Sequence, residues 1–555
     1  MDEQIKKKII LAHSFHSNSD NKFYTESDRL IKYKNIAELL NDRLSKSDFE
    51  YIKYFDESSV TTYTYKEFLS RVNNLANFLK SNSIKFEDRI ATFSVNHVDT
   101  VILYFACWIS GAVVMPVNIS EDKNRIRYIL ENSGARMVFT RDEYLDKLNG
   151  TLTQDIKVIS FDSLDYSEYN ETFSPDQIPD WNTESMIVYT SGTTSNPKGV
   201  VLTQYNLMVD AHYIAQWHDI KENDTMMCVL PIHHVNGTVV TVVTTMYTGG
   251  RLILNKKFST ENFLKRISEE KVKIVSVVPT LLQFMIHSNE NARDYDLKHF
   301  SHIICGAGPL TCEISRDFET KFGMRIVHGY GLSESTCYSC FIPYNLSESE
   351  HYKWQNEFGF PSIGIPINCN EMEIHSDSGI TLNEGTRGEI VIRGHNIMKY
   401  YYNNDEVNLE TFKHGWFRSG DEGFFKFDSN GRKYFFITGR IKELIIRGGV
   451  NISPLEIDEV ISGINCVKAG IAVGFENDWY GDEIGALVIL KNEFLNFDKD
   501  ELKRHIIKEC RKKLPFVKSP KVIEFTDIIP VTSTGKYQRN KAKHLFKDYK
   551  KIQFR

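Results

Sequence analysis

Residues 187–200 read IVYTSGTTSNPKGV, an apolar stretch that runs into a loop of glycine and hydroxyl residues and ends near a lysine. Glycines let backbone N–H groups converge, hydroxyls add hydrogen-bond donors and Lys198 adds positive charge, so the segment suits a phosphate group. It differs from a P-loop, because Pro197 stands where that loop requires glycine and Gly199 where it requires serine or threonine. Taken alone, the segment is equally consistent with a polar turn that binds nothing.

The region around this loop alternates between helical and strand-like hydrophobic periods. Phe68, Val72, Leu75 and Leu79 recur at helical spacing, and residues 90–93 then read as a strand. The alternation returns over residues 185–260 and 270–330, so we expect parallel strands with crossover helices and doubly wound α/β layers over the first 330 residues. The segments expected next after 90–93 are a helix over 97–110, a strand over 112–117, a helix near 125–131 and a strand over 136–140.

The pattern of hydrophobic residues and turns changes after residue 360. Short strand-like segments alternate with Gly-rich turns at 385–388 and 428–431, which predicts a small β region, barrel-like or rich in hairpins. After Arg440 the alternation of helix and strand resumes over about a hundred residues, enough for a separate domain. A chain of 555 residues also exceeds what one hydrophobic core usually supports. We therefore expect an N-terminal domain over residues 1–440 and a small α+β C-terminal domain over residues 441–555.

Composition and charge exclude several classes of protein. The 67 basic and 73 acidic residues give a net charge of −6, so no surface for nucleic acid or anionic membrane is expected. The longest apolar run, residues 101–117, contains serine, glycine and proline and is short for a membrane span, which predicts buried helix, turn and strand. No secretory signal opens the chain, and nine scattered cysteines fit a reducing cytoplasm. Cys337 and Cys340 lack a second pair that would complete a zinc site, so we expect them in a pocket or core wall.

The string from Thr190 to Lys198, Thr-Ser-Gly-Thr-Thr-Ser-x-Pro-Lys, resembles the signature of the adenylate-forming superfamily, which includes acyl-CoA synthetases, firefly luciferase and peptide-synthetase adenylation domains. The resemblance covers nearly the whole chain. It implies a large N-terminal domain of two α/β subdomains with a small β region, then a small mobile C-terminal domain. It also implies an enzyme that joins a carboxylic acid to AMP at the expense of ATP. The further motifs, in the order of that family, are ICGAGPL (304–310), YGLSE (330–334), GWFRSGD (415–421), ITGRIK (437–442), GGVNISPLEI (448–457) and TGK (534–536).

The resemblance implies a site for ATP and one Mg²⁺ ion. Tyr330 would lie on adenine, Arg440 would support the ribose, and Asp421 would accept both ribose hydroxyls, which two carboxylate oxygens can do. Glu334 would hold Mg²⁺, an ion that usually takes one or two carboxylates together with phosphate oxygens and water. The residues implied for the phosphates are Thr190, Ser191, Gly192, Thr193, Thr194, Lys198 and Ser333, and those implied for adenine are Gly306, Ala307, Gly308 and Tyr330.

The resemblance also implies the two steps of the reaction. Lys536 would contact the carboxylate and the α-phosphate during adenylation, and no side-chain nucleophile or base is needed because the acid is already ionised. The C-terminal domain would then rotate about the hinge Lys442, which removes Lys536 and brings Gly449 to the channel for the thiol. Glycine suits that position, because only a missing side chain lets the pantetheine arm of coenzyme A pass.

The resemblance places the acyl pocket at His234, Asn236 and Cys305. His234 is a second candidate catalytic residue, with a core histidine as the alternative reading. Residues 234–245 contain no acidic side chain, which argues against an α-amino acid, since a buried ammonium needs a paired charge.

The acceptor is expected to be coenzyme A, because no carrier segment follows the lysine motif before the chain stops at Arg555. The alternative is a stand-alone adenylation enzyme that loads an acyl carrier protein in trans or forms an amide. A distant alternative is a non-catalytic relative that binds a nucleotide or an acid; such a relative is expected to have lost Glu334 or Lys536, and both are present.

Overall fold

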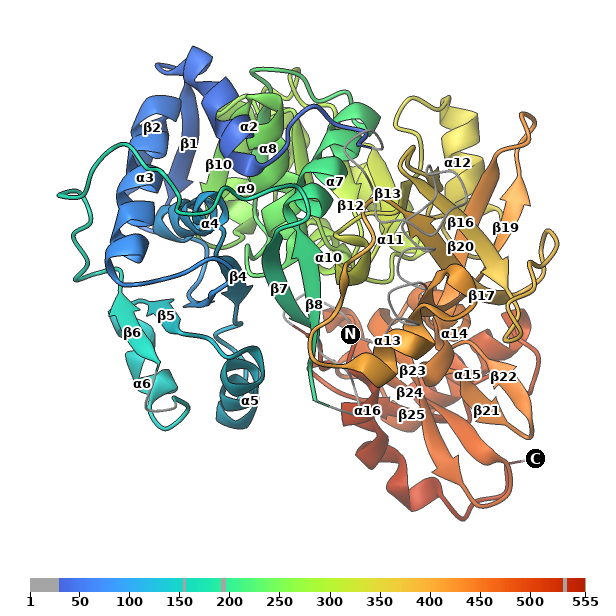
Figure 1. Cartoon of the computed structure of the whole chain (residues 1–555). Helices are drawn as coiled ribbons and strands as arrows, with labels where there is room; N and C mark the ends of the chain where they lie inside the picture. Colours follow the sequence, from blue (N-terminus) through green and yellow to red (C-terminus); the bar gives the residue numbers. More distant parts are fainter. Residues whose placement is uncertain (1–28, 153–155, 191–195, 533–536, 555) are drawn as a thin grey trace.

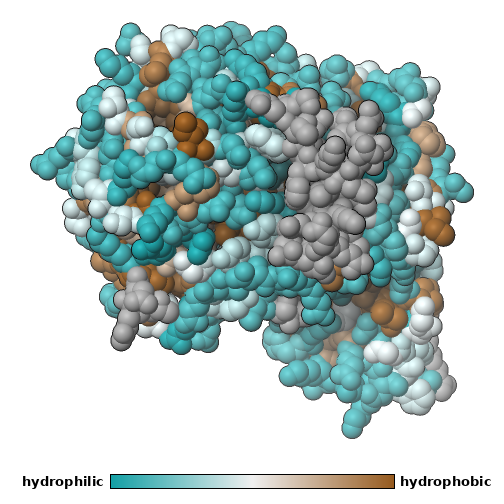
Figure 2. Space-filling view, in the orientation of Figure 1, coloured by the Kyte–Doolittle hydropathy of each residue, from teal (hydrophilic) through white to brown (hydrophobic). Residues whose placement is uncertain are grey.

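The computed structural model describes residues 29–152, 156–190, 196–532 and 537–554. The N-terminal part contains two large sheets and a small antiparallel one, and the C-terminal part, coloured orange to red, forms a lobe below them (Figure 1). The face shown in Figure 2 is mainly hydrophilic, with hydrophobic residues scattered over it. This arrangement confirms the predicted fold class, a large α/β N-terminal domain followed by a small α+β domain.

The larger sheet has nine strands. They are β1 (Glu50–Phe55), β2 (Val60–Thr64), β9 (Thr225–Cys228), β10 (Arg251–Asn255), β11 (Ile274–Val277), β12 (His302–Cys305), β13 (Ile326–Tyr330), β14 (Cys340–Phe341) and β15 (Ile365–Pro366). Their order is β15-β14-β13-β12-β11-β9-β10-β1-β2, parallel from β13 to β1 and antiparallel at both edges. Strands β9 to β13 are buried along almost their whole length, as expected for a parallel sheet covered on both faces.

The second sheet has seven strands. They are β3 (Arg89–Phe93), β4 (Val113–Pro116), β5 (Met137–Thr140), β6 (Lys157–Ser160), β7 (Glu184–Thr190), β8 (Lys198–Thr203) and β18 (Tyr400–Tyr401). Their order is β18-β8-β7-β4-β3-β5-β6, and β8 is antiparallel to both of its neighbours. The candidate phosphate segment thus joins two antiparallel strands, with Thr190 opposite Lys198. A P-loop leads from a strand into a helix instead, so the structure agrees with the exclusion of that class.

Helices connect the strands as the hydrophobic periods predict. They are α2 (Ile36–Arg43), α3 (Tyr65–Ser81), α4 (Val98–Ser110), α5 (Lys123–Ser133), α6 (Leu145–Leu148), α7 (Gln204–Trp217), α8 (Thr244–Thr248), α9 (Thr260–Glu269), α10 (Pro279–Ile286), α11 (Cys312–Phe322), α12 (Glu348–Asn356) and α13 (Asp405–Thr411), with a π-helical segment over Asn236–Val243. α3 begins with a capping box of Thr64 and Glu67, and α4 ends at Gly111, whose φ is 76°. The apolar run 101–117 is therefore buried helix, turn and strand, as predicted. Within the described part of the chain, no helix is long and apolar enough to cross a membrane.

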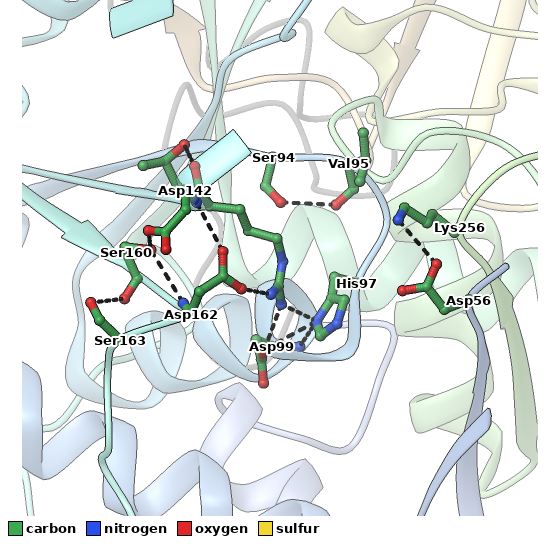
Figure 3. A network of polar contacts seen from close by, with 12 residues as sticks. Asp56, Ser94, Val95, His97, Asp99, Asp142, Ser160, Asp162, Ser163 and Lys256 are labelled. Carbon is green, nitrogen blue, oxygen red and sulfur yellow. Dashed lines mark hydrogen bonds and ion pairs between the residues drawn. The ribbon is translucent and has the colours of Figure 1, made fainter. Parts of the chain in front are cut away.

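Polar side chains at the carboxyl ends of strands in both large sheets line one pocket, among them Asp142 and Asp162 of one sheet and the ion pair of Asp56 and Lys256 of the other (Figure 3). Arg141, which follows β5, donates to Asp99 at 2.6 Å. Asn96, which follows β3, donates to the carbonyl oxygens of Leu230 and Asn255, each at 2.9 Å. Because Leu230 and Asn255 belong to the strand ends of the other sheet, these bonds tie the two α/β subdomains together.

A four-stranded antiparallel sheet follows the two large sheets, at the place of the expected β region. Its strands, in spatial order, are β16 (Asn370–His375), β17 (Gly388–Gly394), β19 (Phe417–Phe427) and β20 (Lys433–Arg440). The C-terminal lobe contains β21 (Ile445–Arg447), β22 (Val450–Ile452), β23 (Val467–Asn477), β24 (Gly481–Leu490), β25 (Val522–Phe525), α14 (Pro454–Ser462), α15 (Lys499–Lys513) and α16 (Arg539–Ala542). Its apolar side chains form a core of their own. This separate core supports a domain boundary at Arg440, which stays a proposal.

All nine cysteines are buried free thiols. Cys337 and Cys340 lie in the hydrophobic core, and burial raises the pKa of both thiols. Among the residues that the structure describes, no group of three His, Cys, Asp or Glu side chains is arranged to hold a metal ion.

Candidate active site

A cavity of about 180 Å³ lies between the N-terminal part of the chain and the C-terminal lobe. Five of the residues predicted for adenine and ribose line it, although they come from four separate segments. They are Ala307, Gly308, Tyr330, Asp421 and Arg440. The opposite wall is formed by α14 and by the segment around α16. The structure therefore brings the predicted nucleotide residues to one cavity and closes it with the C-terminal lobe.

Asp421 and Arg440 face each other directly across β19 and β20. Tyr330 donates its hydroxyl hydrogen to Asp421 Oδ2 at 2.5 Å, and Arg440 Nε lies 2.8 Å from Asp421 Oδ1. The Asp421 carboxylate raises the pKa of the Arg440 guanidinium, which stays charged. Apart from this ion pair, Asp421 Oδ1 is buried and receives no well-formed hydrogen bond from the described residues. A ribose hydroxyl would supply that missing bond, so the site fits a nucleotide.

The loop after β12 needs small residues because its neighbours approach closely. A Cβ atom at Gly306 would lie 2.6 Å from the Tyr338 hydroxyl oxygen, too close for any other residue without a shift. Ala307 has a φ of 60°, in the left-handed region that few side chains adopt. With this backbone conformation, Ala307 and Gly308 line the cavity. Gly306 does not line it and packs against Tyr338 instead.

Lys198 and Glu334 come together beside Tyr401. Tyr401 donates its hydroxyl hydrogen to Glu334 Oε1 at 2.6 Å, and Lys198 Nζ lies 5.0 Å from the centre of the Tyr401 ring. Burial and the charge of Lys442 lower the pKa of Lys198, and Glu334 opposes that shift. Glu334 also contributes to the raised pKa of Arg440, after Asp421 and Tyr330, whereas burial opposes the rise. A lysine and a carboxylate thus lie together near the ribose residues, as an anionic phosphate chain with a metal ion requires.

The remaining predicted phosphate residues flank this pair. Thr190 ends β7 opposite Lys198, and Ser333 begins the short turn Ser333–Ser335 that carries Glu334. Ser191, Gly192, Thr193 and Thr194 lie outside the described residues.

Two contacts of the site are not marked by any sequence motif. Tyr401 reaches Glu334 because β18 pairs with β8, and the only local signal is the aromatic run at residues 400–402. Arg539 forms a buried ion pair with Asp458 and donates from Nη1 to the Ala472 carbonyl oxygen at 2.8 Å. These bonds hold the wall of the cavity that the C-terminal lobe provides.

The residue that follows the predicted catalytic lysine belongs to the cavity wall. Lys536 itself lies outside the described residues, but Tyr537, which follows it, lines the cavity. Lys442 is exposed in the turn Ile441–Glu443. Gly449 is exposed between β21 and β22 with a φ of 82°, and a Cβ atom built there meets no described heavy atom within 4 Å. In this orientation of the lobe, Tyr537 lines the cavity and the Gly449 hairpin lies in solvent.

Two of the three predicted acyl-pocket residues, Asn236 and Cys305, lie near Tyr338. Asn236 Nδ2 donates to the Tyr338 hydroxyl oxygen at 3.2 Å, and Cys305 is wholly buried at the end of β12. Burial raises the pKa of the Cys305 thiol, so the thiol stays protonated. His234 is partly exposed, unlike a core histidine, and its ring centre lies 4.4 Å from that of His233. We keep His234 as a proposed pocket residue.

Residues 45–402 match the family model of the AMP-binding enzymes, and residues 456–536 match the model of the C-terminal domain of these enzymes. The chain belongs to the AMP-binding enzyme family. The predicted membership of the adenylate-forming superfamily is thereby confirmed.

Relatives of this AMP-binding enzyme include a sulfoacetate–CoA ligase from Cupriavidus necator, 31% identical over 463 residues, which are 81% of this chain and 86% of the relative. A feruloyl-CoA synthase from Amycolatopsis is 29% identical over 486 residues, 88% of this chain and 94% of the relative. The crystal structure of ATP-bound MatB from Rhodopseudomonas palustris has a TM-score of 0.82 at 23% identity and covers 92% of this chain and 99% of its own. This AMP-binding enzyme therefore shares the fold of MatB over nearly its whole length.

Proposed function

We propose that this enzyme activates a small carboxylic acid with ATP to form acyl-AMP and pyrophosphate, then transfers the acyl group to the thiol of coenzyme A. The observation that carries the proposal is the cavity where Tyr330, Asp421 and Arg440 face Tyr537 and Arg539. Relatives that are CoA ligases support the assignment as an AMP-forming acid–thiol ligase. Nine buried free thiols support a reducing location, the cytoplasm.

The nucleotide would be held by groups that already lie in place. Asp421 would accept hydrogen bonds from the ribose hydroxyls, and the backbone of Ala307 and Gly308 would face the base. Glu334 fits a Mg²⁺ ion, because the residue is 9% exposed and Tyr401 orients its carboxylate beside Lys198. When bound, Mg²⁺ would neutralise phosphate charge.

Adenylation brings an anionic carboxylate to an anionic phosphate, so positioning and neutralisation of charge must supply most of the acceleration. We assign this task to Lys198 and Lys536, together with backbone N–H groups of the loop after β7. The acid needs no general base, because its carboxylate is ionised at neutral pH. Closure by the C-terminal lobe would exclude water that otherwise competes for the acyl-AMP.

Transfer to coenzyme A requires a second arrangement of the C-terminal lobe. The Gly449 hairpin lies in solvent in the structure, so it can line a thiol channel only after the lobe has moved. We propose rotation about Lys442, which would withdraw the segment before Tyr537 and present Gly449.

The proposal is tested by measuring acid-dependent exchange of pyrophosphate into ATP and by detecting acyl-CoA with mass spectrometry. Lys536→Ala should lower acyl-AMP formation by about 10²–10³, the effect of removing one positioned transition-state donor. Thioester formation from supplied acyl-AMP should fall far less in that variant. Equal loss of both steps would contradict the role of Lys536. Exchange without any acyl-CoA product would favour an acyl carrier protein or an amine as the acceptor instead.

A further inference from the structure

Tyr338 occupies the space behind the wall of the nucleotide cavity. It follows Glu334 by four positions and is 1% exposed. A Cβ atom at Gly306 would lie 2.6 Å from the Tyr338 hydroxyl oxygen, and one at Gly329 would lie 2.9 Å from its ring. The ring therefore fills the room that these two glycines leave at the ends of β12 and β13. Gly306 immediately precedes Ala307, which lines the cavity, so the Tyr338 hydroxyl ends directly behind the cavity wall.

Buried hydrogen bonds hold Tyr338 at both ends of the residue. At its tip, Asn236 Nδ2 donates to the hydroxyl oxygen at 3.2 Å, and Ser276 Oγ donates to Asn236 Oδ1 at 2.7 Å. At its backbone, Asn396 Nδ2 donates to the Tyr338 carbonyl oxygen and to Asp210 Oδ1, each at 2.8 Å. The four partner residues are between 0% and 7% exposed. Moving the ring aside would break the Asn236 bond to its hydroxyl where water cannot replace it, and the Asn396 bond holds the backbone from which the ring extends, so Tyr338 is a fixed wall.

The direction of the acid follows from the proposed function, on which this inference rests. The carboxylate must reach the α-phosphate of ATP, so the tail of the acid must extend from the nucleotide cavity into the protein beside Gly306. Cys305 immediately precedes Gly306, and Asn236 donates to the Tyr338 hydroxyl that packs against Gly306, so a tail in this direction meets the Tyr338 ring. We propose that Tyr338 sets the depth of the acid pocket and restricts this enzyme to short acids, from acetate to about butyrate in size.

Larger acids do not fit beside this wall. An aryl acid or a long-chain acid needs the volume that the Tyr338 ring occupies, and a close-packed interior does not supply it by small shifts. Membership of the family does not decide this point, because the named relatives range from a sulfoacetate–CoA ligase to a feruloyl-CoA synthase. The side chain at position 338 is therefore the feature of this chain that we expect to select the length of the acid.

The test compares wild type with Tyr338→Val in pyrophosphate exchange with acetate, butyrate, hexanoate, octanoate and benzoate. In wild type, kcat/KM should fall at least about tenfold from butyrate to octanoate, since single methylenes already change specificity on this scale. In Tyr338→Val, the ratio of octanoate to butyrate should rise at least about tenfold. Tyr338→Phe keeps the ring and should keep the short-acid profile. Tyr51→Val changes another fully buried tyrosine, in β1, and should leave the ratio unchanged.

Wild-type preference for octanoate or benzoate over butyrate would overturn the proposal, as would an unchanged ratio in a folded Tyr338→Val variant. If that variant does not fold, calorimetry with wild type decides the point, using acetyl- and octanoyl-sulfamoyl adenosine as mimics of acyl-AMP. Weaker binding of the octanoyl compound supports the proposal, and equal or tighter binding overturns it. Absence of exchange with every acid contradicts the proposed function instead, and the binding measurement still decides the depth of the pocket.

Discussion

Glu459 joins the two domains, and we predict that its ionisation controls how firmly they dock. It lies in α14 of the C-terminal lobe, and its two carboxylate oxygens accept the backbone N–H of Cys312, the first residue of α11, at 2.9 and 3.2 Å. Burial raises the pKa of Glu459 to about 7, hydrogen bonds from Cys312 oppose the rise, and the neighbouring Glu313 and Asp458 carboxylates add to it.

The size and sign of the effect follow from this pKa. A rise from the ordinary value of 4.5 to about 7 corresponds to about 3 kcal/mol in favour of the protonated, docked form. Solvent reaches the partly exposed carboxylate, so we expect about 1–3 kcal/mol in practice. The docked state binds the proton more tightly than the undocked state. The contribution of Glu459 to the docking free energy therefore has its full value below the pKa of the undocked carboxyl. That contribution is lost as the pH rises from about 4.5 to about 7.

The assay is energy transfer between one dye on each domain, recorded from about pH 5 to about pH 8. Wild type should undock progressively over this range. Glu459→Gln cannot ionise, so it should stay docked and should also transfer the acyl group more slowly at the upper end of the range. A wild-type signal that does not change with pH, or the same pH profile in both proteins, would refute the reasoning.

Variants at two further positions probe the remaining parts of the site. Gly449→Leu should continue pyrophosphate exchange but stop acyl-CoA formation, because the side chain meets open space in this arrangement and would fill the thiol channel in the other. Gly449→Ala has similar left-handed strain of about 1–3 kcal/mol with little bulk, and equal loss of both steps in the two variants would show a structural role. Glu334→Ala should raise the Mg²⁺ concentration needed for exchange while the protein stays folded, because one metal ligand is removed. A wild-type Mg²⁺ titration in that variant would count against this position of the metal.

Local elements of this chain are predictable because their signals lie within the segment itself. The strand expected over residues 90–93 is Arg89–Phe93, and the helix expected over 97–110 is Val98–Ser110, with His97 as its N-cap. The hydrophobic period and the caps are short-range features, so no knowledge of the rest of the fold is needed.

Contacts between distant segments are less predictable. Tyr401 reaches Glu334 only through the pairing of β18 with β8, and no motif surrounds it. Tyr338 belongs to none of the motifs quoted from the sequence, and only the packed structure shows its hydroxyl against Gly306. The five nucleotide residues can be assigned from the order of the motifs, because each of them lies within a motif. The side chains that orient them cannot be assigned in this way, because they reach the site only in the folded structure.

Arg440 is the last residue of β20, and Lys442 follows it by two positions in the turn Ile441–Glu443. If the C-terminal domain rotates about this turn, the rotation axis passes next to the ribose site. Atoms close to the axis hardly move, whereas the far end of the domain moves through a wide arc. An acyl-adenylate held by Asp421 and Arg440 would stay in place while one face of the lobe is exchanged for the other. The bound acyl-adenylate can then be the product of the first reaction and the substrate of the second without leaving its binding site.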